Sequence, residues 1–198
     1  MLAALAGLVV SLPAGAVGSG MSRSTDWTQW GQGSEHRDAA EVPGRPLDAA
    51  AVDYVTDPFV AQEKDTCGAA SLAMVLRYWD APVSHDEIAA ALVQPELHGA
   101  LGSRLGAFAR ARGFTAIAYA GETRQLREMV AKGRPLIVAW QIAPGRFHNV
   151  VVVGVDRSGN VMVNDPAVGA GRFVSAADFE RRWAGAGRWT LLVQPADR

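Results

Sequence analysis

The sequence has one cysteine, Cys67, among 198 residues, and its basic and acidic residues nearly cancel. Lys and Arg number 19 against 20 Asp and Glu, which leaves a formal net charge of −1 and no long-range field to attract nucleic acid or an anionic membrane. Hydrophobic residues make up 49% of the chain and charged residues 20%, a balance typical of globular proteins. We therefore expect one folded domain with an appended segment, and no nucleic-acid partner.

Patterns that bind metals or cofactors are missing as well. His36, His85 and His98 show no ligand spacing with one another or with Cys67, and we expect all three at the surface. Neither a phosphate-binding glycine loop nor a dinucleotide-binding fingerprint occurs. The sequence thus predicts no metal site and no cofactor.

The N-terminal segment, residues 1–20, is apolar and carries no charged residue. It is short and interrupted by Pro13 and by glycines, and Ala14-Gly15-Ala16 has the small-x-small form that signal peptidase accepts. We predict a cleaved signal peptide, with Met21 as an alternative start, and an exported protein, periplasmic or extracellular, with no stable membrane insertion after cleavage. A lipid anchor requires a cysteine just after the apolar segment, so none is expected.

Residues 21–50 are polar and rich in Gly, Ser, Asp and Arg, which predicts a linker or arm ahead of a folded domain at residues 51–198. Trp27 and Trp30 in this arm either pack on the domain or form a contact surface. We favour packing, because isolated aromatic residues usually have an apolar partner. The chemistry of the protein is therefore expected in residues 51–198.

The folded part changes character along its length. Its first half has apolar residues at helical spacing, which predicts helices at 66–79, from Ser84 to before Pro95, at 103–112 and around 126–130, with one strand at 115–120. Its second half has short β-branched runs, which predict strands from Pro135, His148, Asn160 and Arg188, with one helix near 175–183. This order predicts an α+β domain with an N-terminal helical lobe and a C-terminal antiparallel β-sheet lobe.

Cys67 lies at or next to the first residue of the 66–79 helix, where unpaired backbone N–H groups and the helix dipole stabilise an anion. A cysteine so placed and paired with an imidazolium has its thiol pKa lowered from about 8.5 to roughly 3.5–7.5, and the thiolate is the nucleophilic form. Gln62, five positions earlier, is able to return its side-chain amide to the same place and form an oxyanion hole with the backbone N–H of Cys67. We favour a nucleophile over a buried structural cysteine, because an unpaired thiol in an exported protein is open to oxidation.

Three segments follow one another in a recognisable order. Gln62 precedes Cys67-Gly68 and the helix AASLAMVLRYW, His148 heads FHNVVVVGVD, and Asp165 ends VMVNDP. In this combination the sequence resembles the papain-like cysteine peptidases that remove double-glycine leaders from bacteriocins and peptide pheromones, and in particular their stand-alone exported members. The resemblance covers about residues 58–193 and implies a two-lobed papain-like domain that acts on a peptide or protein substrate.

The resemblance also implies a role for each residue. His148 would take the Cys67 proton, and Asp165 would hold the imidazole in the correct tautomer. Hairpin geometry alone does not join these two residues, because a two-residue turn at Ser158-Gly159 places Asp165 opposite Val152, roughly 13 Å along the strand from His148. A bulge or a different loop has to shorten that distance.

Three functions use these residues. The leading hypothesis is peptide-bond hydrolysis through an acyl-enzyme. The same triad serves acyl transfer or glutamine deamidation, since the residues do not fix the acceptor. An inactive peptidase-like module that binds extended peptides is the third. The sequence leaves the substrate sequence and the oligomeric state open.

Overall fold

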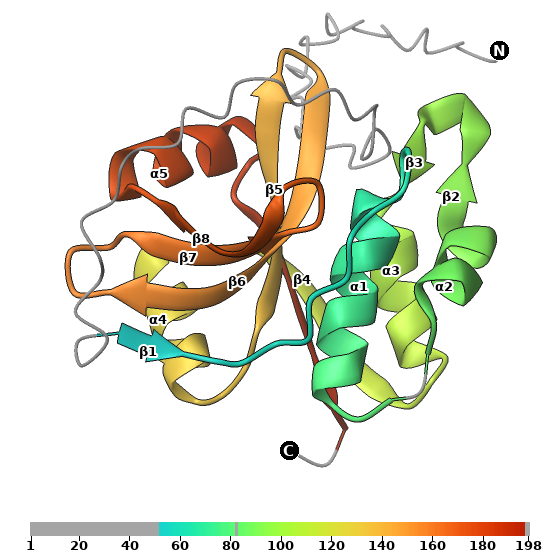
Figure 1. Cartoon of the computed structure of the whole chain (residues 1–198), viewed down its shortest axis with the longest axis horizontal. Helices are drawn as coiled ribbons and strands as arrows, with labels where there is room; N and C mark the ends of the chain where they lie inside the picture. The colour runs from blue at the N-terminus through green and yellow to red at the C-terminus, as the bar shows by residue number, and fades with distance from the viewer. Residues whose placement is uncertain (1–51, 82, 197–198) are drawn as a thin grey trace, which may run out of the picture.

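The structure, a computed structural model, describes residues 52–81 and 83–196. Figure 1 shows helices α1 (Cys67–Tyr78), α2 (His85–Leu92) and α3 (Gly102–Arg110) beside a curved sheet that carries α4 (Thr123–Ala131) and α5 (Ala176–Gly185). This arrangement confirms the expected α+β fold with a helical lobe and an antiparallel sheet lobe. The predicted signal peptide and the arm with Trp27, Trp30 and His36 lie outside the described residues.

The sheet has seven strands, all paired antiparallel. Its order is β4 (Phe114–Ala120), β9 (Trp189–Pro195), β5 (Leu136–Ala143), β6 (Arg146–Asp156), β7 (Val161–Asp165) and β8 (Gly169–Val174), with β1 (Val52–Tyr54) paired to β6. β5 pairs with β6 as far as Val152, and β1 pairs with the same edge of β6 from Gly154 to Asp156. β6 is therefore the central strand, and it is buried from His148 to its end.

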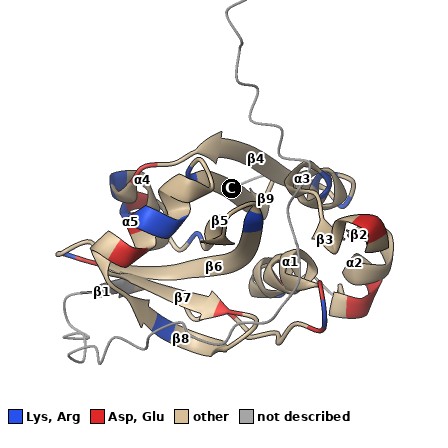
Figure 2. Cartoon of the chain, turned by 90° about the horizontal axis from the view of Figure 1, so that it is seen from above, with Lys and Arg blue, Asp and Glu red and all other residues tan. Residues whose placement is uncertain are grey.

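The helical lobe is built around α1. Every residue from Cys67 to Leu76 is buried, because α1 packs against β6 on one side and against α2 and α3 on others. Seen from above, α1 lies between the sheet and α2 (Figure 2). The small residues Gly68 to Ser71 and Ala73 allow close contact on the faces of α1 away from its large apolar side chains. A short ribbon of β2 (Val93–Gln94) and β3 (Gly99–Ala100), with the 3-10 turn η2 (Pro95–Leu97) between, completes this lobe.

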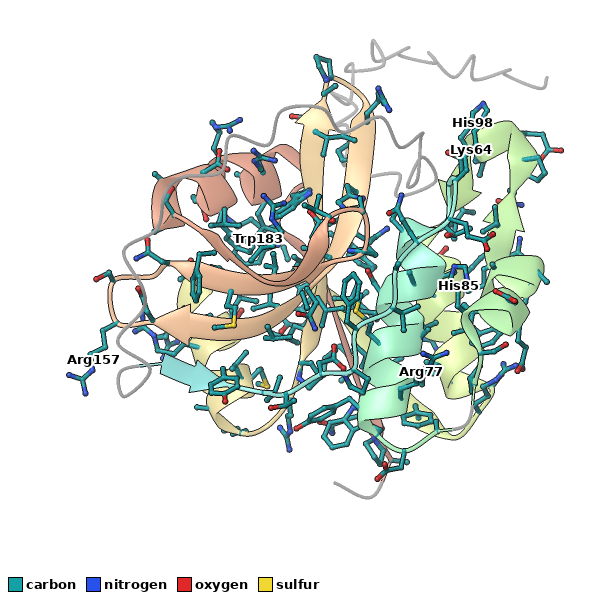
Figure 3. All side chains as sticks on the ribbon, viewed as in Figure 1. Lys64, Arg77, His85, His98, Arg157 and Trp183 are labelled. Atoms are coloured by element: carbon teal, nitrogen blue, oxygen red, sulfur yellow. The ribbon has the colours of Figure 1, made fainter. Side chains whose placement is uncertain are left out.

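The expectation that His85 lies at the surface is wrong. His85 is 8% exposed, and its Nε2 lies 3.0 Å from the hydroxyl of Thr66, the residue before the cysteine. That hydroxyl also accepts from the backbone N–H of Glu63 at 2.8 Å and donates to the Glu63 carbonyl at 3.0 Å. Figure 3 shows His85 between α2 and α1. These bonds connect α2 to the loop that leads into α1. His98, in contrast, is at the surface as expected, with 58% of its side chain exposed.

Large aromatic residues fill the space between α5 and the sheet. Trp183 of α5 lies between that helix and the sheet (Figure 3), and Trp183 and Phe179 are almost fully buried. Phe179 lies against Trp140 of β5 with ring centroids 6.4 Å apart. Trp140 pairs across the strands with His148, and their ring centroids are 6.2 Å apart. The first part of β6 therefore has a rigid apolar support.

Both signs of charge occur on α4 and on α5, on the outside of the molecule (Figure 2). Among the described residues, no helix combines the length and hydrophobicity that a membrane span requires.

Candidate active site

The β6–β7 hairpin brings His148 and Asp165 together. Val155 pairs with Val161, one residue out of the register that a two-residue turn would give, and a bulge between Val152 and Gly154 shifts the register by one more. Val151 therefore pairs with Asn164, and Asp165 lies beside position 150, two residues from His148 instead of four. The Nε2 atom of His148 lies 2.7 Å from Oδ1 of Asp165. The loop and the bulge together supply the shortening that the sequence argument required.

Asp165 is 1% exposed and surrounded by donors. Its Oδ1 also accepts from the backbone N–H of Ala167 at 3.0 Å, and its Oδ2 lies 3.3 Å from the guanidinium of Arg172 on β8. Burial would raise the pKa of Asp165, but the bond and charge of His148, the Ala167 N–H and the Arg172 charge lower it below its usual value. The carboxylate is therefore ionised and fixes the orientation of the His148 ring.

Cys67 is the first residue of α1, and its sulfur is hydrogen-bonded to His148 and Asn149. Because Nε2 of His148 is held by Asp165, Nδ1 is the ring nitrogen that faces the sulfur. Burial would raise the pKa of the thiol, but the bond and charge of His148 and two bonds from Asn149 lower it. Burial would likewise lower the pKa of His148, whereas its bonds to Asp165 and Cys67 raise it to about 10. The groups favour a thiolate beside an imidazolium, and the first turn of α1 has no acidic residue to oppose the negative sulfur.

Gln62 lies in the loop before α1, next to the end of β7. Its backbone N–H donates to the carbonyl of Pro166 at 2.9 Å, and Pro166 directly follows Asp165. The Oε1 atom of Gln62 is buried and has no hydrogen-bond partner among the described residues. The loop is thus fixed beside the catalytic candidates, while the oxyanion role of the Gln62 side chain stays a prediction.

Asp57 is a residue near the site that the sequence argument missed. Its backbone carbonyl accepts from the side chain of Asn164 at 3.2 Å, which ties the segment before Gln62 to β7. Its carboxyl group is buried, and neither oxygen has a partner among the described residues. Burial raises its pKa to about 7. An Asp-Pro pair after a short strand resembles an ordinary turn, so no sequence pattern indicates this burial.

The side chains around Cys67 determine whether this site is suited to a metal ion. No group of three or more His, Cys, Asp or Glu side chains is gathered for a metal ion within the described ranges. His148, the histidine closest to the thiol, has both ring nitrogens engaged, by Asp165 and by Cys67. The arrangement is suited to proton transfer and nucleophilic attack by sulfur.

Known proteins share this fold. Residues 55–190 match the sequence profile of the Peptidase_C39 like family. The structure is similar to a double glycine motif protease from an AMS/PCAT transporter in complex with the leader peptide, with 26% identity, a TM-score of 0.60, and coverage of 72% of this chain and 94% of that chain. It is also similar in fold to the peptidase domain of Streptococcus ComA, a bi-functional ABC transporter, with 21% identity, a TM-score of 0.58, and coverage of 69% and 96%. No curated protein sequence matches the chain.

The charge state of the sulfur provides a first prediction. Replacing His148→Asn removes the imidazolium and leaves burial as the main influence, so the pKa of Cys67 should rise to its ordinary value or above, whereas it lies below that value in the unmodified protein. Thiolate absorbance in the ultraviolet, titrated against pH and referenced to Cys67→Ala, measures this directly, because the chain has one cysteine. Equal titration midpoints in the two proteins would refute the pairing.

Asp57 provides a second prediction. Between its unfolded pKa of 3.8 and its folded pKa of about 7, the unfolded state ionises while the folded state stays protonated, so rising pH destabilises the fold. Asp57→Asn removes this loss. The free energy of unfolding of Asp57→Asn minus that of the unmodified protein should therefore grow by up to about 4 kcal/mol between about pH 4 and pH 8. Urea unfolding at several pH values measures it, and a difference that stays constant with pH contradicts the buried neutral carboxyl.

Proposed function

The chain belongs to the Peptidase_C39 like family, and from this premise we propose that it is a cysteine peptidase that hydrolyses peptide bonds through a Cys67 acyl-enzyme. The observation that carries the proposal is the buried chain of contacts from Asp165 through His148 to the sulfur at the start of α1. Such a chain supplies a nucleophile, a base and a group that orients the base.

The reaction runs in two halves. The Cys67 thiolate attacks the carbonyl carbon of the substrate, and the tetrahedral intermediate collapses as His148 gives its proton to the departing amine. The products of this half are a free amine and a thioester on Cys67. His148, now neutral, takes a proton from water, which attacks the thioester and releases the carboxylic acid. The sulfur leaves as the thiolate, beside an imidazolium again, and Asp165 keeps the ring in place throughout.

Negative charge develops on the substrate oxygen in both halves. We assign its stabilisation to the backbone N–H of Cys67 and the side-chain amide of Gln62. The support is the position of Gln62, whose loop is bonded to Pro166 at the end of β7 and leads through Thr66 into α1. The loss of one such donor typically removes about 2.7–4 kcal/mol of transition-state stabilisation.

A peptide is the substrate class that the comparisons support. The double glycine motif protease, 26% identical to this chain, holds a leader peptide in its structure. A leader that ends in two glycines is accordingly the first substrate to test, alongside peptides without that motif. A Gly-Gly pair has no side chains beside the scissile bond. This suits attack by Cys67, because that residue is only 5% exposed.

The proposal predicts cleavage that requires the thiol. Purified protein should cleave members of a peptide library that includes double-glycine leaders, and Cys67→Ala and His148→Ala should reduce cleavage by at least about a thousandfold, the scale seen when a nucleophile or base is removed. Mass spectrometry of the products gives the bond that is cut. His98→Ala is the matched control, because His98 is exposed and lies at η2, and it should keep full activity.

Three results would replace the proposal. Equal product from the unmodified protein and Cys67→Ala would assign cleavage to another group. Release of ammonia from a glutamine peptide, or its conjugation to an added amine, in the absence of cleavage would assign the triad to deamidation or acyl transfer. If none of these reactions occurs and peptides still bind, the chain is an inactive peptide-binding module.

We also propose that the protein is exported. The support is the uncharged apolar segment at residues 1–20 with Ala14-Gly15-Ala16 near its end. Expressed with its full N-terminus in a bacterial host, the protein should be found outside the cytoplasm, and mass spectrometry should show its new N-terminus just after Ala16. A cytoplasmic protein that begins at Met1 or Met21 would refute export.

A further inference from the structure

Asn149 is a buried polar residue in an unexpected place. It is 1% exposed and lies in the centre of the sheet, within the run HNVVVVGV on β6, where every following residue up to Asp156 is buried. Asn is depleted in strands, and a valine at this position would satisfy both the strand and the core. Its Oδ1 atom is buried and has no hydrogen-bond partner among the described residues. Its low strand preference, its burial and its unpaired oxygen each cost stability. We therefore expect Asn149 to have a compensating role at the site.

The contact that Asn149 does make is with the sulfur. Its Nδ2 atom lies 3.7 Å from Sγ of Cys67, and both its side chain and its backbone N–H lower the pKa of the thiol. A neutral thiol is a weak acceptor, whereas a thiolate is a strong one, so a buried amide aimed at the sulfur is well satisfied only in the charged state. The amide also packs against the start of α1, because a Cβ added at Gly68 would lie 3.4 Å from the same Nδ2.

The strand geometry explains how neighbouring residues both reach one atom. Side chains of consecutive strand residues point to opposite faces, so His148 and Asn149 are not expected to share a target. The sulfur, however, lies within reach of the Asn149 amide, and the backbone N–H of Asn149 also lowers the pKa of the thiol, which is consistent with a sulfur at the edge of β6. On that side the pairing with β7 ends at Val151–Asn164, and the start of α1 takes the place of the next strand residues. A sulfur at the edge of β6 is accessible from both faces of the sheet. The His148 side chain can therefore reach it from one face and the Asn149 side chain from the other.

We propose that Asn149 is a further catalytic residue, whose side-chain amide donates a hydrogen bond to the Cys67 thiolate and holds it ready for attack. This role rests on the proposed function, in which Cys67 is the nucleophile. His148 supplies the opposite charge and later the proton, whereas Asn149 supplies a neutral donor that loses no proton during the cycle. The amide stabilises the sulfur when it carries charge, before acylation and after hydrolysis, and interacts weakly with it in the thioester.

The test compares two variants of nearly the same size as asparagine. Asn149→Leu removes the donor, and Asn149→Asp replaces it with a carboxylate that repels the thiolate, while both keep the backbone N–H. The thiolate titration midpoint, followed by ultraviolet absorbance against Cys67→Ala, should rise in the order unmodified, Leu, Asp. On the acid side of the unmodified midpoint, Asn149→Leu should hold about tenfold less thiolate, the effect of one charge-assisted bond.

The rate of alkylation by iodoacetamide separates this role from a structural one. Below the unmodified midpoint Asn149→Leu should react about tenfold more slowly, whereas at high pH it should react as fast or faster, because a less stabilised thiolate is more nucleophilic. A purely structural residue would change the melting temperature and leave the titration midpoint unchanged, and that result overturns the proposal. If Asn149→Leu does not fold, the midpoint of Asn149→Asp decides alone.

Alkylation and titration need no peptide substrate. A raised midpoint in the variants of a protein that cleaves no peptide would refute the peptidase proposal and leave the role of Asn149 intact. Conversely, thiol-dependent cleavage with an unchanged midpoint would refute the role of Asn149 alone. The acid limb of the cleavage rate against pH should move with the midpoint if both hold.

Discussion

The buried contact between the Cys67 sulfur and the His148 ring, which favours a thiolate beside an imidazolium, is the constraint on which the rest of the structure depends. Burial disfavours each charge separately, and the pair is stable only because each member has further partners. The start of α1 and Asn149 stabilise the sulfur, and Asp165 stabilises the ring. These partners come from α1, β6 and β7, so the charge pair exists only when helical lobe and sheet are both in place. Fold and reactivity are thereby coupled.

The sequence predicted the elements of this fold far better than their register. Helix starts and strand runs follow from local chemistry, such as the Ser84 cap that accepts from the N–H of Glu87 and begins α2. Register depends on the loop after Asp156 and on the bulge beside Gly154, and both are set by packing against the rest of the sheet. The family resemblance was therefore needed to join His148 to Asp165. The estimate from a two-residue turn placed Asp165 two residues too far along the strand, and the observed register explains the difference.

Two of the single residues that were missed, His85 and Asn149, have partners distant in sequence, whereas the missed strand β8 has a local cause. β8 was missed because GAGRFV has two glycines and lies at the sheet edge, so its apolar pattern is weak. His85 follows a helix cap and looks exposed, but its partner Thr66 lies 19 residues earlier. Asn149 did leave a signal, as the one amide in a valine run beside the predicted base. Strict alternation along the strand hid its meaning, since it assigns neighbours to opposite faces.

The end of β7 positions more of the site than its one catalytic candidate. Asp165 directs its carboxylate to His148, while Asn164 holds the carbonyl of Asp57 and the carbonyl of Pro166 holds the N–H of Gln62. The orienting carboxylate and the loop of the proposed oxyanion donor are therefore attached to three consecutive residues of one strand end. Because the two are fixed to the same backbone, a displacement of β7 moves them together, and the distance between the orienting carboxylate and the loop of the oxyanion donor is preserved. Such a shared attachment provides the preorganisation that catalysis by fixed dipoles requires.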